Sequence, residues 1–552
     1  MRPPSRALTV ASGIFSSRLL GLVRERAVAH YLGLSPYTDA LTTAFRGPNV
    51  LQVLLGEQTL SASFIPTYSQ LLEEGREEEA GRFAGAIFGL LAAAAGALSL
   101  LGILLARPLV AVLSAGYLQD AAAVAAGETS VDRYELAVMA VRWIFPMMAL
   151  LVLSAWALGV LNSHRRFFWP YFSPVLWNAA IITALLVAAG ALGTPWCDPR
   201  DAGHGYQTCL LIAVCIGALI GGALQFAVQL PQVFRLMKGF RFSLSTRVVG
   251  VRRALRAFGP AFAGRGVVQV SLYLDQFLAS LVAVGAPAAI RWAGVVYALP
   301  ISLFGMSIAA SELPEMARQA SAGADLRGRV EVSLRRMAFL IMPTTVGYLA
   351  LGFLLVGALF RSGEFSAEAN WLVYLVLAAY TLGLPASTAS RLLQNLFFAL
   401  GDTRTPAKVA AQRVFVSALL GAALMFTLDR YRITALVEVA GPSEGLFLGA
   451  AGLALGSAAG SWLEILRLRR ALREPLPDFR LPVAAGLAMG GLALLALVPA
   501  LLLWRWLAPL PVVALAVLVI ATYAAAYGGL ALLFRVPEAR EWLAGIRRRI
   551  GA

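Results

Sequence analysis

Apolar runs of about twenty residues recur along the whole chain, and they constrain its fold more than any other feature. The clearest are 90–105, 136–160, 175–192, 209–226, 339–359, 483–503 and 511–533. A bilayer has a hydrocarbon core of about 30 Å and a helix rises about 1.5 Å per residue, so one such run makes one span. With 59% hydrophobic and 14% charged residues, the composition is that of a membrane protein rather than a soluble one.

The hydropathy pattern predicts an all-α polytopic membrane protein of about fourteen transmembrane helices. The predicted spans are 7–32, 37–68, 83–106, 134–161, 171–192, 209–234, 257–285, 287–316, 337–360, 370–399, 407–428, 443–466, 482–504 and 511–534. No soluble segment between them is long enough to form an enzyme domain. An even number of spans places both termini on the same side of the membrane.

The basic residues between the spans predict which side that is. About thirty arginines and lysines fall on the face that carries the termini, against about seven on the other face, among them Arg107, Arg133 and Arg200. Because cytoplasmic loops are enriched in basic residues, we expect a multi-pass protein with both termini in the cytoplasm. This distribution also accounts for the net charge of +16 without nucleic acid as a partner, and no nucleic-acid motif is present.

The cysteines and histidines show no pattern typical of a metal site or an enzyme. Cys197 and Cys209 flank a polar loop that we expect outside the cytoplasm, where either a disulfide or two separate thiols is compatible with the sequence. The three histidines are far apart in sequence, and no Ser/His/Asp or Cys/His set is visible. A phosphate-binding G-x-x-x-x-G-K-[ST] loop is also absent. We therefore expect neither enzymatic activity nor a bound cofactor.

Charged residues inside the first two spans indicate a polar cavity. A charge at mid-bilayer on an exposed helix costs roughly 2.5–3.5 kcal/mol, so such groups must face water, each other or a charged ligand. Glycines and Pro48 loosen the same two helices, as expected of helices that line a cavity. The charged residues are Arg18, Arg24, Glu25, Arg26, Asp39, Arg46 and Glu57.

The second half of the chain adds further charges within predicted spans: Arg265, Asp275, Arg291, Arg391 and Arg413. Arginine presents a planar fork that binds phosphate through two hydrogen bonds and stays protonated. A cavity lined by arginines would therefore suit a diphosphate, and the predicted set is Arg18, Arg24, Arg46, Arg265 and Arg291. For Arg26, Arg391 and Arg413 we expect internal ion pairs or positions at the membrane interface instead.

Several motifs resemble the MurJ (MviN) family of lipid II flippases. The N-terminal part contains Ser17-Arg18-Leu19-Leu20-Gly21-Leu22-Val23-Arg24-Glu25, then Thr38-Asp39-Ala40 and Ala44-Phe45-Arg46-Gly47-Pro48-Asn49. Phe64-Ile65-Pro66, Gly363-Glu364-Phe365 and Leu400-Gly401-Asp402-Thr403-Arg404-Thr405-Pro406 follow in the same order as in the family. The resemblance covers nearly the whole chain, and the first and last of these blocks are its most specific parts.

The resemblance implies the multidrug/oligosaccharidyl-lipid/polysaccharide exporter fold, with two six-helix lobes around a central cavity and two further helices beside a groove for a lipid tail. On this basis we expect an N-lobe at 1–234, a basic cytoplasmic linker at 235–256, a C-lobe at 257–470 and C-terminal helices with a basic tail at 471–552. The implied activity is alternating access that moves an undecaprenyl-diphosphate-linked peptidoglycan precursor from the cytoplasmic to the periplasmic leaflet of the bacterial inner membrane. A membrane potential or a gradient of Na⁺ or H⁺ would drive it. Membrane lipids and the cell-wall synthesis machinery are the other implied partners.

The family's functional positions transfer to this sequence one by one. Arg18, Arg24 and Asp39 match functional positions, a basic residue is usual at Arg46, and Glu57 also matches. Asn49 belongs to the same matching block, and Glu25 and Glu57 join Asp39 as the expected cavity carboxylates. Asp275 stands where many members carry Asp or Asn, which makes it the candidate ligand for a coupling cation.

Two departures from the family pattern bear on the substrate. Gln52 replaces a usual arginine, and Gly294-Val295 replaces an Asp-Arg pair. They motivate a second hypothesis, a flippase for another polyprenyl-diphosphate-linked glycan. A cation-coupled exporter of small molecules would instead need an acidic, aromatic cavity. A scaffold of the cell-wall machinery would tolerate substitution of the cavity charges.

Overall fold

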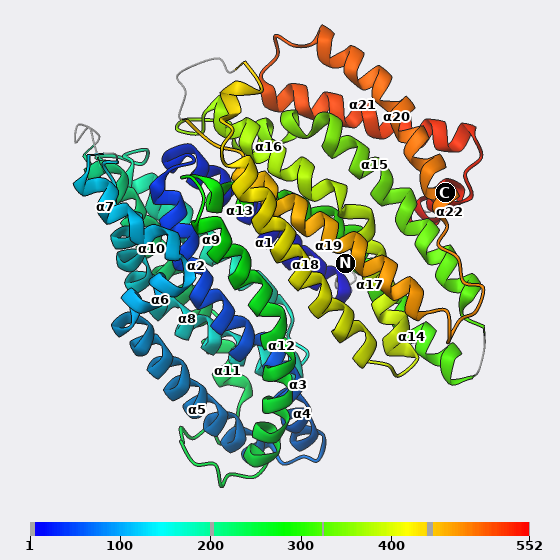
Figure 1. The fold of residues 1–552 in the computed structure, drawn as a ribbon. Coiled ribbons are helices and arrows are strands. Elements are labelled where there is room, and N and C mark those ends of the chain that lie inside the picture. The colour runs from blue at the N-terminus through cyan, green and yellow to red at the C-terminus, as the bar shows by residue number, and fades with distance from the viewer. Residues whose placement is uncertain (1–5, 128, 199–203, 323–324, 439–444, 551–552) are drawn as a thin grey trace. The chain divides into compact units, whose positions relative to one another are not determined.

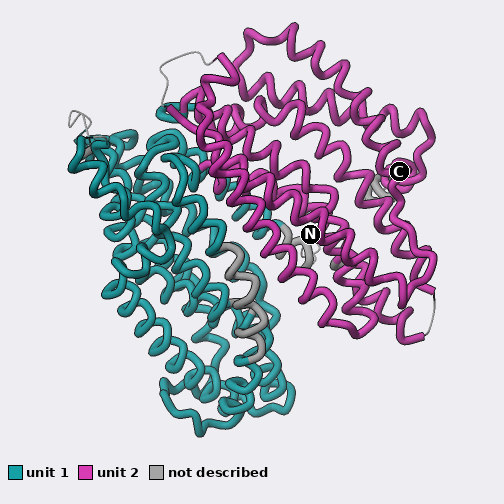
Figure 2. Tube along the Cα trace, viewed as in Figure 1, with its two compact units in different colours: residues 1–288, 362–365 teal, residues 289–361, 366–552 magenta. Residues whose placement is uncertain are grey.

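All regular secondary structure is helical in the residues that the structure, a computed structural model, describes: 6–127, 129–198, 204–322, 325–438 and 445–550 (Figure 1). Only the backbone is described at 6–11, 57–58, 204, 260–272, 310 and 545–550. Two compact units are present (Figure 2): unit 1 comprises 1–288 and 362–365, and unit 2 comprises 289–361 and 366–552. These compact units are not the predicted lobes, because the helix at 251–280 belongs to unit 1 whereas the predicted C-lobe begins at 257. The boundaries of the lobes stay a prediction.

Unit 1 contains the first thirteen elements in chain order. They are α1 (Arg6–Leu32), α2 (Pro36–Leu55), α3 (Glu57–Ser63), α4 (Ile65–Glu73), α5 (Glu77–Leu104), α6 (Ala106–Leu113), the 3₁₀ turn η1 (Ala115–Gln119), α7 (Asp120–Ala125), α8 (Arg133–Ser163), α9 (Phe168–Ala188), α10 (His204–Ala227), α11 (Leu230–Leu236) and α12 (Val251–Ser280).

Unit 2 contains the remaining elements, of which α13 begins at the end of unit 1. They are α13 (Ala286–Pro300), the π-helical turn η2 (Ile301–Gly305), α14 (Met306–Ser321), α15 (Arg327–Phe360), α16 (Ala367–Leu382), α17 (Leu384–Ala399), α18 (Arg404–Leu428), the 3₁₀ turn η3 (Ile433–Ala435), α19 (Gly449–Ala471), α20 (Val483–Trp506), α21 (Val512–Leu533) and α22 (Pro537–Ile550).

Each predicted span coincides with one helix or with consecutive helices, which confirms the all-helical membrane fold. Among the described residues, nine helices are long and apolar enough to cross a membrane, or up to eleven if each of two bent pairs forms one span. The predicted spans at α1, α2–α4, α12 and α19 fall outside this count. The number of about fourteen therefore stays a prediction.

Helix α8 is the central helix of unit 1. Of its most apolar stretch, 78% is buried, against 28% for the neighbouring α9. Its Trp156 is fully buried and donates a hydrogen bond from Nε1 to the carbonyl oxygen of Ala84 on α5, at 3.1 Å. The helices α2, α5 and α10 all pack directly on α8, and α1 packs on α9. Because α8 is held on several sides, it provides a fixed wall for the polar groups described below.

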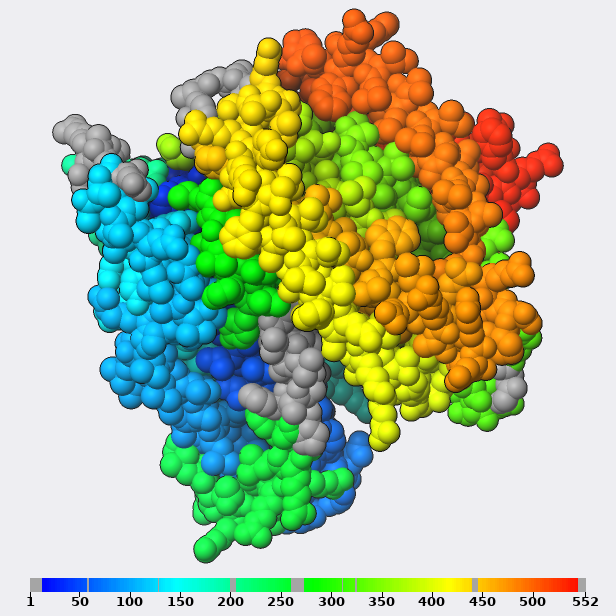
Figure 3. Space-filling view, viewed as in Figure 1, coloured from blue at the N-terminus to red at the C-terminus, as the bar shows by residue number. Residues whose placement is uncertain are grey.

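The basic segment between α11 and α12 packs along one face of α5. Glycines at every fourth residue, Gly81, Gly85 and Gly89, form that face, and a Cβ at Gly85 would lie 2.1 Å from the carbonyl oxygen of Arg241. Only glycine permits so close an approach of two backbones. Figure 3 shows this segment, in green, at the surface beside α5. The predicted cytoplasmic linker is thus a docked part of unit 1 and not a free tether.

In unit 2, α18 and α19 approach each other through small residues. A Cβ at Gly456 would lie 2.4 Å from the backbone of Gly421, and one at Gly460 would overlap the Ser417 hydroxyl. Stripes of small residues are the usual means of close helix packing in membranes. The α18–α19 pair is therefore a rigid element of this unit.

Candidate functional site

A cavity of about 750 Å³ opens within unit 1 between α1, α2, α8, α9 and α10. Arg18 and Arg24 from α1, and Asn49 and Gln52 from α2, line it. Gly13 brings α1 into contact with the backbone of α9, where a Cβ would lie 2.9 Å from Tyr171. The glycine predicted to loosen the first span thus lets α1 pack against the wall of the cavity.

Arg24 is held in place by two neighbours. Its guanidinium lies 4.7 Å from the centre of the Trp177 ring and forms an ion pair at 2.5 Å with Glu25, whose carboxylate is only 3% exposed. A stacked and paired guanidinium has a fixed orientation, since its planar fork cannot turn without losing one contact. Arg24 therefore presents its charge to the cavity from a defined direction.

Arg18 differs from Arg24 because no carboxylate neutralises it. Its side chain is exposed toward the cavity. No carboxylate lies within 4.0 Å of its guanidinium in the part of the chain whose side chains are described. An arginine in a span without an anionic partner is expected to serve a ligand.

Side-chain amides and a hydroxyl complete the polar lining. Gln225 of α10 donates to the Ser154 hydroxyl of α8 at 3.3 Å, and the buried Gln229 donates to the same oxygen at 2.7 Å. Gln229 does not line the cavity itself, whereas Gln225, Ser154, Asn49 and Gln52 line it and offer donors and acceptors without charge. The cavity thus combines a cationic side with neutral hydrogen-bonding groups.

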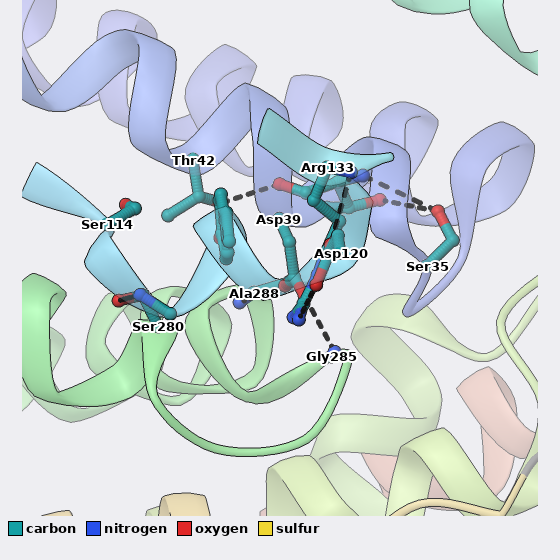
Figure 4. A network of polar contacts seen from close by, with 12 residues as sticks. Ser35, Asp39, Thr42, Ser114, Asp120, Arg133, Ser280, Gly285 and Ala288 are labelled. Atoms are coloured by element: carbon teal, nitrogen blue, oxygen red, sulfur yellow. Dashed lines mark hydrogen bonds and ion pairs between the residues drawn. The ribbon is translucent and has the colours of Figure 1, made fainter. Parts of the chain in front are cut away.

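Asp39 lies in a separate buried network at the beginning of α2 (Figure 4). Its carboxylate is fully buried and accepts hydrogen bonds from the backbone N–H groups of Gly285, at 2.7 Å, and Ala288, at 3.1 Å. Arg133 lies 3.7 Å from it and forms a bidentate ion pair with Asp120 at 2.6 and 2.9 Å. Asp39 therefore fastens the start of α2 to Gly285 and to the first turn of α13.

Hydroxyl and amide groups extend this network. The Thr43 hydroxyl lies 2.9 Å from that of Ser114, and the Gln276 amide of α12 donates to Thr43 at 2.9 Å. The Tyr117 ring lies under the Arg133 guanidinium at 4.6 Å. The network thus links α2, the η1–α7 turn, α8 and α12 within unit 1.

The other predicted site residues lie in several places. Arg46 is half-buried and interacts electrostatically with Tyr273 of α12, but it does not line the cavity. Asp275 is half-buried on α12, and Arg291 is half-buried in unit 2. The side chains of Glu57 and Arg265 lie outside the described residues. The structure thus brings Arg18, Arg24 and Asn49 to one cavity, with Glu25 beside it, and leaves Asp39 in its own network.

Sequence reasoning missed Arg133 and Asp120 because both were assigned to an external loop. The structure buries the two side chains, at 7% and 8% exposure. The available signal was the pairing of one basic and one acidic residue in a short segment between two spans, but such segments are usually solvated. Trp177 and Gln225 were also missed, since each lies on an otherwise apolar helix.

Fold and site together define a polytopic helical membrane protein with an arginine-lined cavity, which is the class of transporters for anionic ligands. The family described as "Lipid II flippase MurJ" matches residues 28–521. The lipid II flippase MurJ of Burkholderia cenocepacia is 30% identical over 88% of this chain and 89% of its own length. A probable lipid II flippase MurJ of Aquifex aeolicus is 28% identical over 77% of this chain and 78% of its own. The chain therefore belongs to the MurJ family of lipid II flippases.

Solved structures agree on the fold. A lipid II flippase MurJ in an inward closed conformation superposes with a TM-score of 0.69 at 21% identity, over 96% of this chain and 99% of that one. An inward-facing multidrug resistance transporter of the MATE family, in the MOP superfamily, superposes with a TM-score of 0.56 at 13% identity, over 86% of this chain and 98% of that one. These likenesses confirm the helical transporter fold that the sequence motifs imply, while the number of about fourteen spans and the bounds of the two lobes stay predictions.

Proposed function

We propose that this protein flips lipid II, a polyprenyl diphosphate that carries a sugar-peptide headgroup, from the cytoplasmic to the periplasmic leaflet of a bacterial inner membrane. The observation that carries the proposal is the Arg18–Arg24 pair in the cavity of unit 1, one guanidinium stacked and paired and the other without a carboxylate. Two arginines at one cavity provide the bidentate donors that a diphosphate requires. The family membership of the chain supports the same substrate.

The cavity accommodates both parts of such a headgroup. The diphosphate would lie against Arg18 and Arg24, while Asn49, Gln52 and Gln225 would donate to and accept from sugar hydroxyls. Because Glu25 stays paired with Arg24, the empty cavity would not hold two uncompensated cations. Alternating access would then carry the headgroup across without exposing it to hydrocarbon.

An apolar groove in unit 2 supports a lipid as the ligand. It has a volume of about 210 Å³ and lies between α15, α17, α19 and α20. Met337, Ile341, Trp462 and Leu487 are among its lining residues. Removing apolar surface from water is favourable by roughly 25 cal/mol per Å². Such a groove would therefore retain the polyprenyl tail while the headgroup moves.

The disulfide between Cys197 and Cys209 supports the proposed orientation. Such bonds form in oxidising compartments, which for a bacterial inner-membrane protein means the periplasmic side. The α9–α10 connection would therefore be periplasmic. The excess of basic residues on the face that carries the termini independently supports cytoplasmic termini.

The energy source would be a cation gradient or the membrane potential. Asp275 remains the candidate for a coupling Na⁺ or H⁺ because it is a half-buried carboxylate on α12. Among the described residues, no group of three His, Cys, Asp or Glu side chains could hold a metal ion, so Na⁺ would need carbonyl or hydroxyl oxygens as well. Flipping in vesicles with an imposed Na⁺ gradient, H⁺ gradient or potential would distinguish the three sources.

A second candidate function is transport of another polyprenyl-diphosphate-linked glycan. Gln52 favours it, because this neutral amide lines the cavity where the family usually has an arginine. A cavity with one cation fewer suits a headgroup with fewer negative charges. Association with the cell-wall synthesis machinery is compatible with either substrate.

Complementation of a strain depleted of its own lipid II flippase tests the proposal. We expect wild type to restore growth and Arg18→Ala and Arg24→Ala to fail at equal membrane abundance. Arg82→Ala, which removes an exposed arginine of α5, is the matched control and should behave as wild type. Growth with either cavity variant would contradict the role of the arginines. Failure of correctly inserted wild type would favour the other glycan.

A further inference from the structure

A second group of charged residues lies inside unit 2, on α17, α18 and α19. Glu464 of α19 is 1% exposed, and both of its carboxylate oxygens are engaged. Arg413 of α18 donates to one at 2.8 Å, and the Gln394 amide of α17 donates to the other at 2.7 Å. A buried carboxylate with a cation and an amide donor is electrostatically satisfied, so Glu464 needs no further ligand.

Arg391 of α17 adds a positive charge that this carboxylate does not neutralise. It interacts electrostatically with Arg413 and Glu464. No carboxylate lies within 4.0 Å of its guanidinium in the part of the chain whose side chains are described. Of the two alternatives expected for these arginines, the internal ion pair is found for Arg413, and a position at the membrane interface stays a prediction for Arg391. Two arginines share one glutamate, so this group of three side chains carries one net positive charge.

The position of Arg391 on α17 shows that it does not face the apolar groove. Four residues of α17 line that groove, namely Pro385, Ala386, Thr388 and Ala389, and Arg391 is not among the lining residues. At 100° per residue, the centre of this lining face is roughly 140° from Arg391, whereas Ser387 is only about 40° from it. The Ser387 hydroxyl lies 3.0 Å from the hydroxyl of Tyr297 on α13. Arg391 therefore projects from the polar face of α17.

We propose that Arg391 and Arg413 form an oxyanion-binding subsite in unit 2, with Glu464 as the resident anion that neutralises Arg413 while the subsite is empty. Arg391 is exposed and the Arg413 side chain is 32% exposed, so both can reach a ligand, whereas Glu464 is buried behind them. An incoming oxyanion would take the free donors of the two guanidiniums and need not displace Gln394 from Glu464. The inference rests on the proposed transport of an anionic lipid and extends it to a second subsite.

The oxyanion has two chemical sources in such a ligand, the diphosphate and the carboxylates of the peptide. Two probes separate them: undecaprenyl diphosphate, which has no peptide, and lipid II with its peptide. Binding of each is measured with the purified full-length protein in lipid nanodiscs. The variants are Arg391→Gln, Arg413→Gln and Glu464→Gln. Arg404→Gln is the matched control, because it removes an exposed arginine nine residues before Arg413 on the same helix, roughly 13 Å away along the axis.

We expect Arg391→Gln and Arg413→Gln each to weaken binding about tenfold, as is usual when one charged hydrogen-bond donor is lost. Glu464→Gln should tighten binding severalfold because it removes the competing anion. Arg404→Gln should leave binding unchanged. Weaker binding of both probes assigns the subsite to phosphate, and weaker binding of lipid II alone assigns it to peptide carboxylate.

Two outcomes would overturn the subsite. One is wild-type affinity for both probes in Arg391→Gln and Arg413→Gln, and the other is weaker binding in Glu464→Gln. If Glu464→Gln does not fold, the double variant Arg413→Gln/Glu464→Gln removes the pair without leaving a buried charge, and it should bind as weakly as Arg413→Gln. If wild type binds neither probe, the proposed function fails. If only the proposed subsite is wrong, the wild-type protein still binds the probes.

Discussion

Removal of the Asp39 carboxylate offers a direct measure of what the buried network contributes to unit 1. In Asp39→Ala, the N–H groups of Gly285 and Ala288 lose their acceptors at 2.7 and 3.1 Å. Each buried donor without an acceptor costs about 1–3 kcal/mol, so the two together cost about 2–6 kcal/mol. Arg133 keeps Asp120 as its counter-ion and contributes little to the loss. For a unit of this size we expect an apparent Tm lower by roughly 5–10 °C.

The assay is thermal unfolding of the purified protein in detergent, followed by tryptophan fluorescence. Asp39→Asn keeps one carbonyl oxygen as an acceptor and should lose roughly half as much. Glu135→Ala is the control, because that carboxylate is 49% exposed and forms its ion pair with the exposed Arg107. Such a pair contributes about 0–1 kcal/mol. If Asp39→Ala unfolds within about 1 °C of Glu135→Ala, the buried network does not stabilise unit 1.

Three further predictions concern packing, topology and pH. Gly85→Val should displace the linker from α5, because a Cβ there would lie 2.1 Å from the Arg241 carbonyl oxygen; faster proteolysis of the linker than in Gly96→Val, which has open space, would show it. Cys197→Ser should leave Cys209 open to a membrane-impermeant thiol reagent added to spheroplasts, and labelling only after lysis would contradict the periplasmic assignment. Burial lowers the pKa of His164 from 6.5, so the neutral ring is favoured in the fold. Stability should therefore fall as the pH drops through about 6.5, and His164→Gln should flatten the pH dependence of the Tm.

The fold was predictable because its signals are local. A span is an apolar run that can be recognised without knowledge of its neighbours, and the helices coincide with the predicted runs. The place of Arg18 and Arg24 at one cavity was predictable for a similar reason, since charge in a span demands a polar surrounding.

What the sequence could not provide are the pairings between distant segments. Arg413 and Glu464 are 51 residues apart, and nothing in their local sequences indicates that they meet. Asp120 and Arg133 are 13 residues apart in a segment that composition assigns to a solvated loop. Their burial depends on how η1 and α7 fold back on α8, which hydropathy does not describe. The glycines of α5 likewise do not indicate which segment of the chain packs on them.

Helix α17 carries groove residues on one face and Arg391 on the other, and this arrangement has a consequence for ligand selection. An apolar tail in the groove would contact one face of α17, and an oxyanion at Arg391 would contact another face of the same helix. A detergent would engage only the first side, and a soluble sugar nucleotide only the second. The position of α17 would thus respond fully only to a ligand in which an apolar tail and an oxyanion are covalently joined.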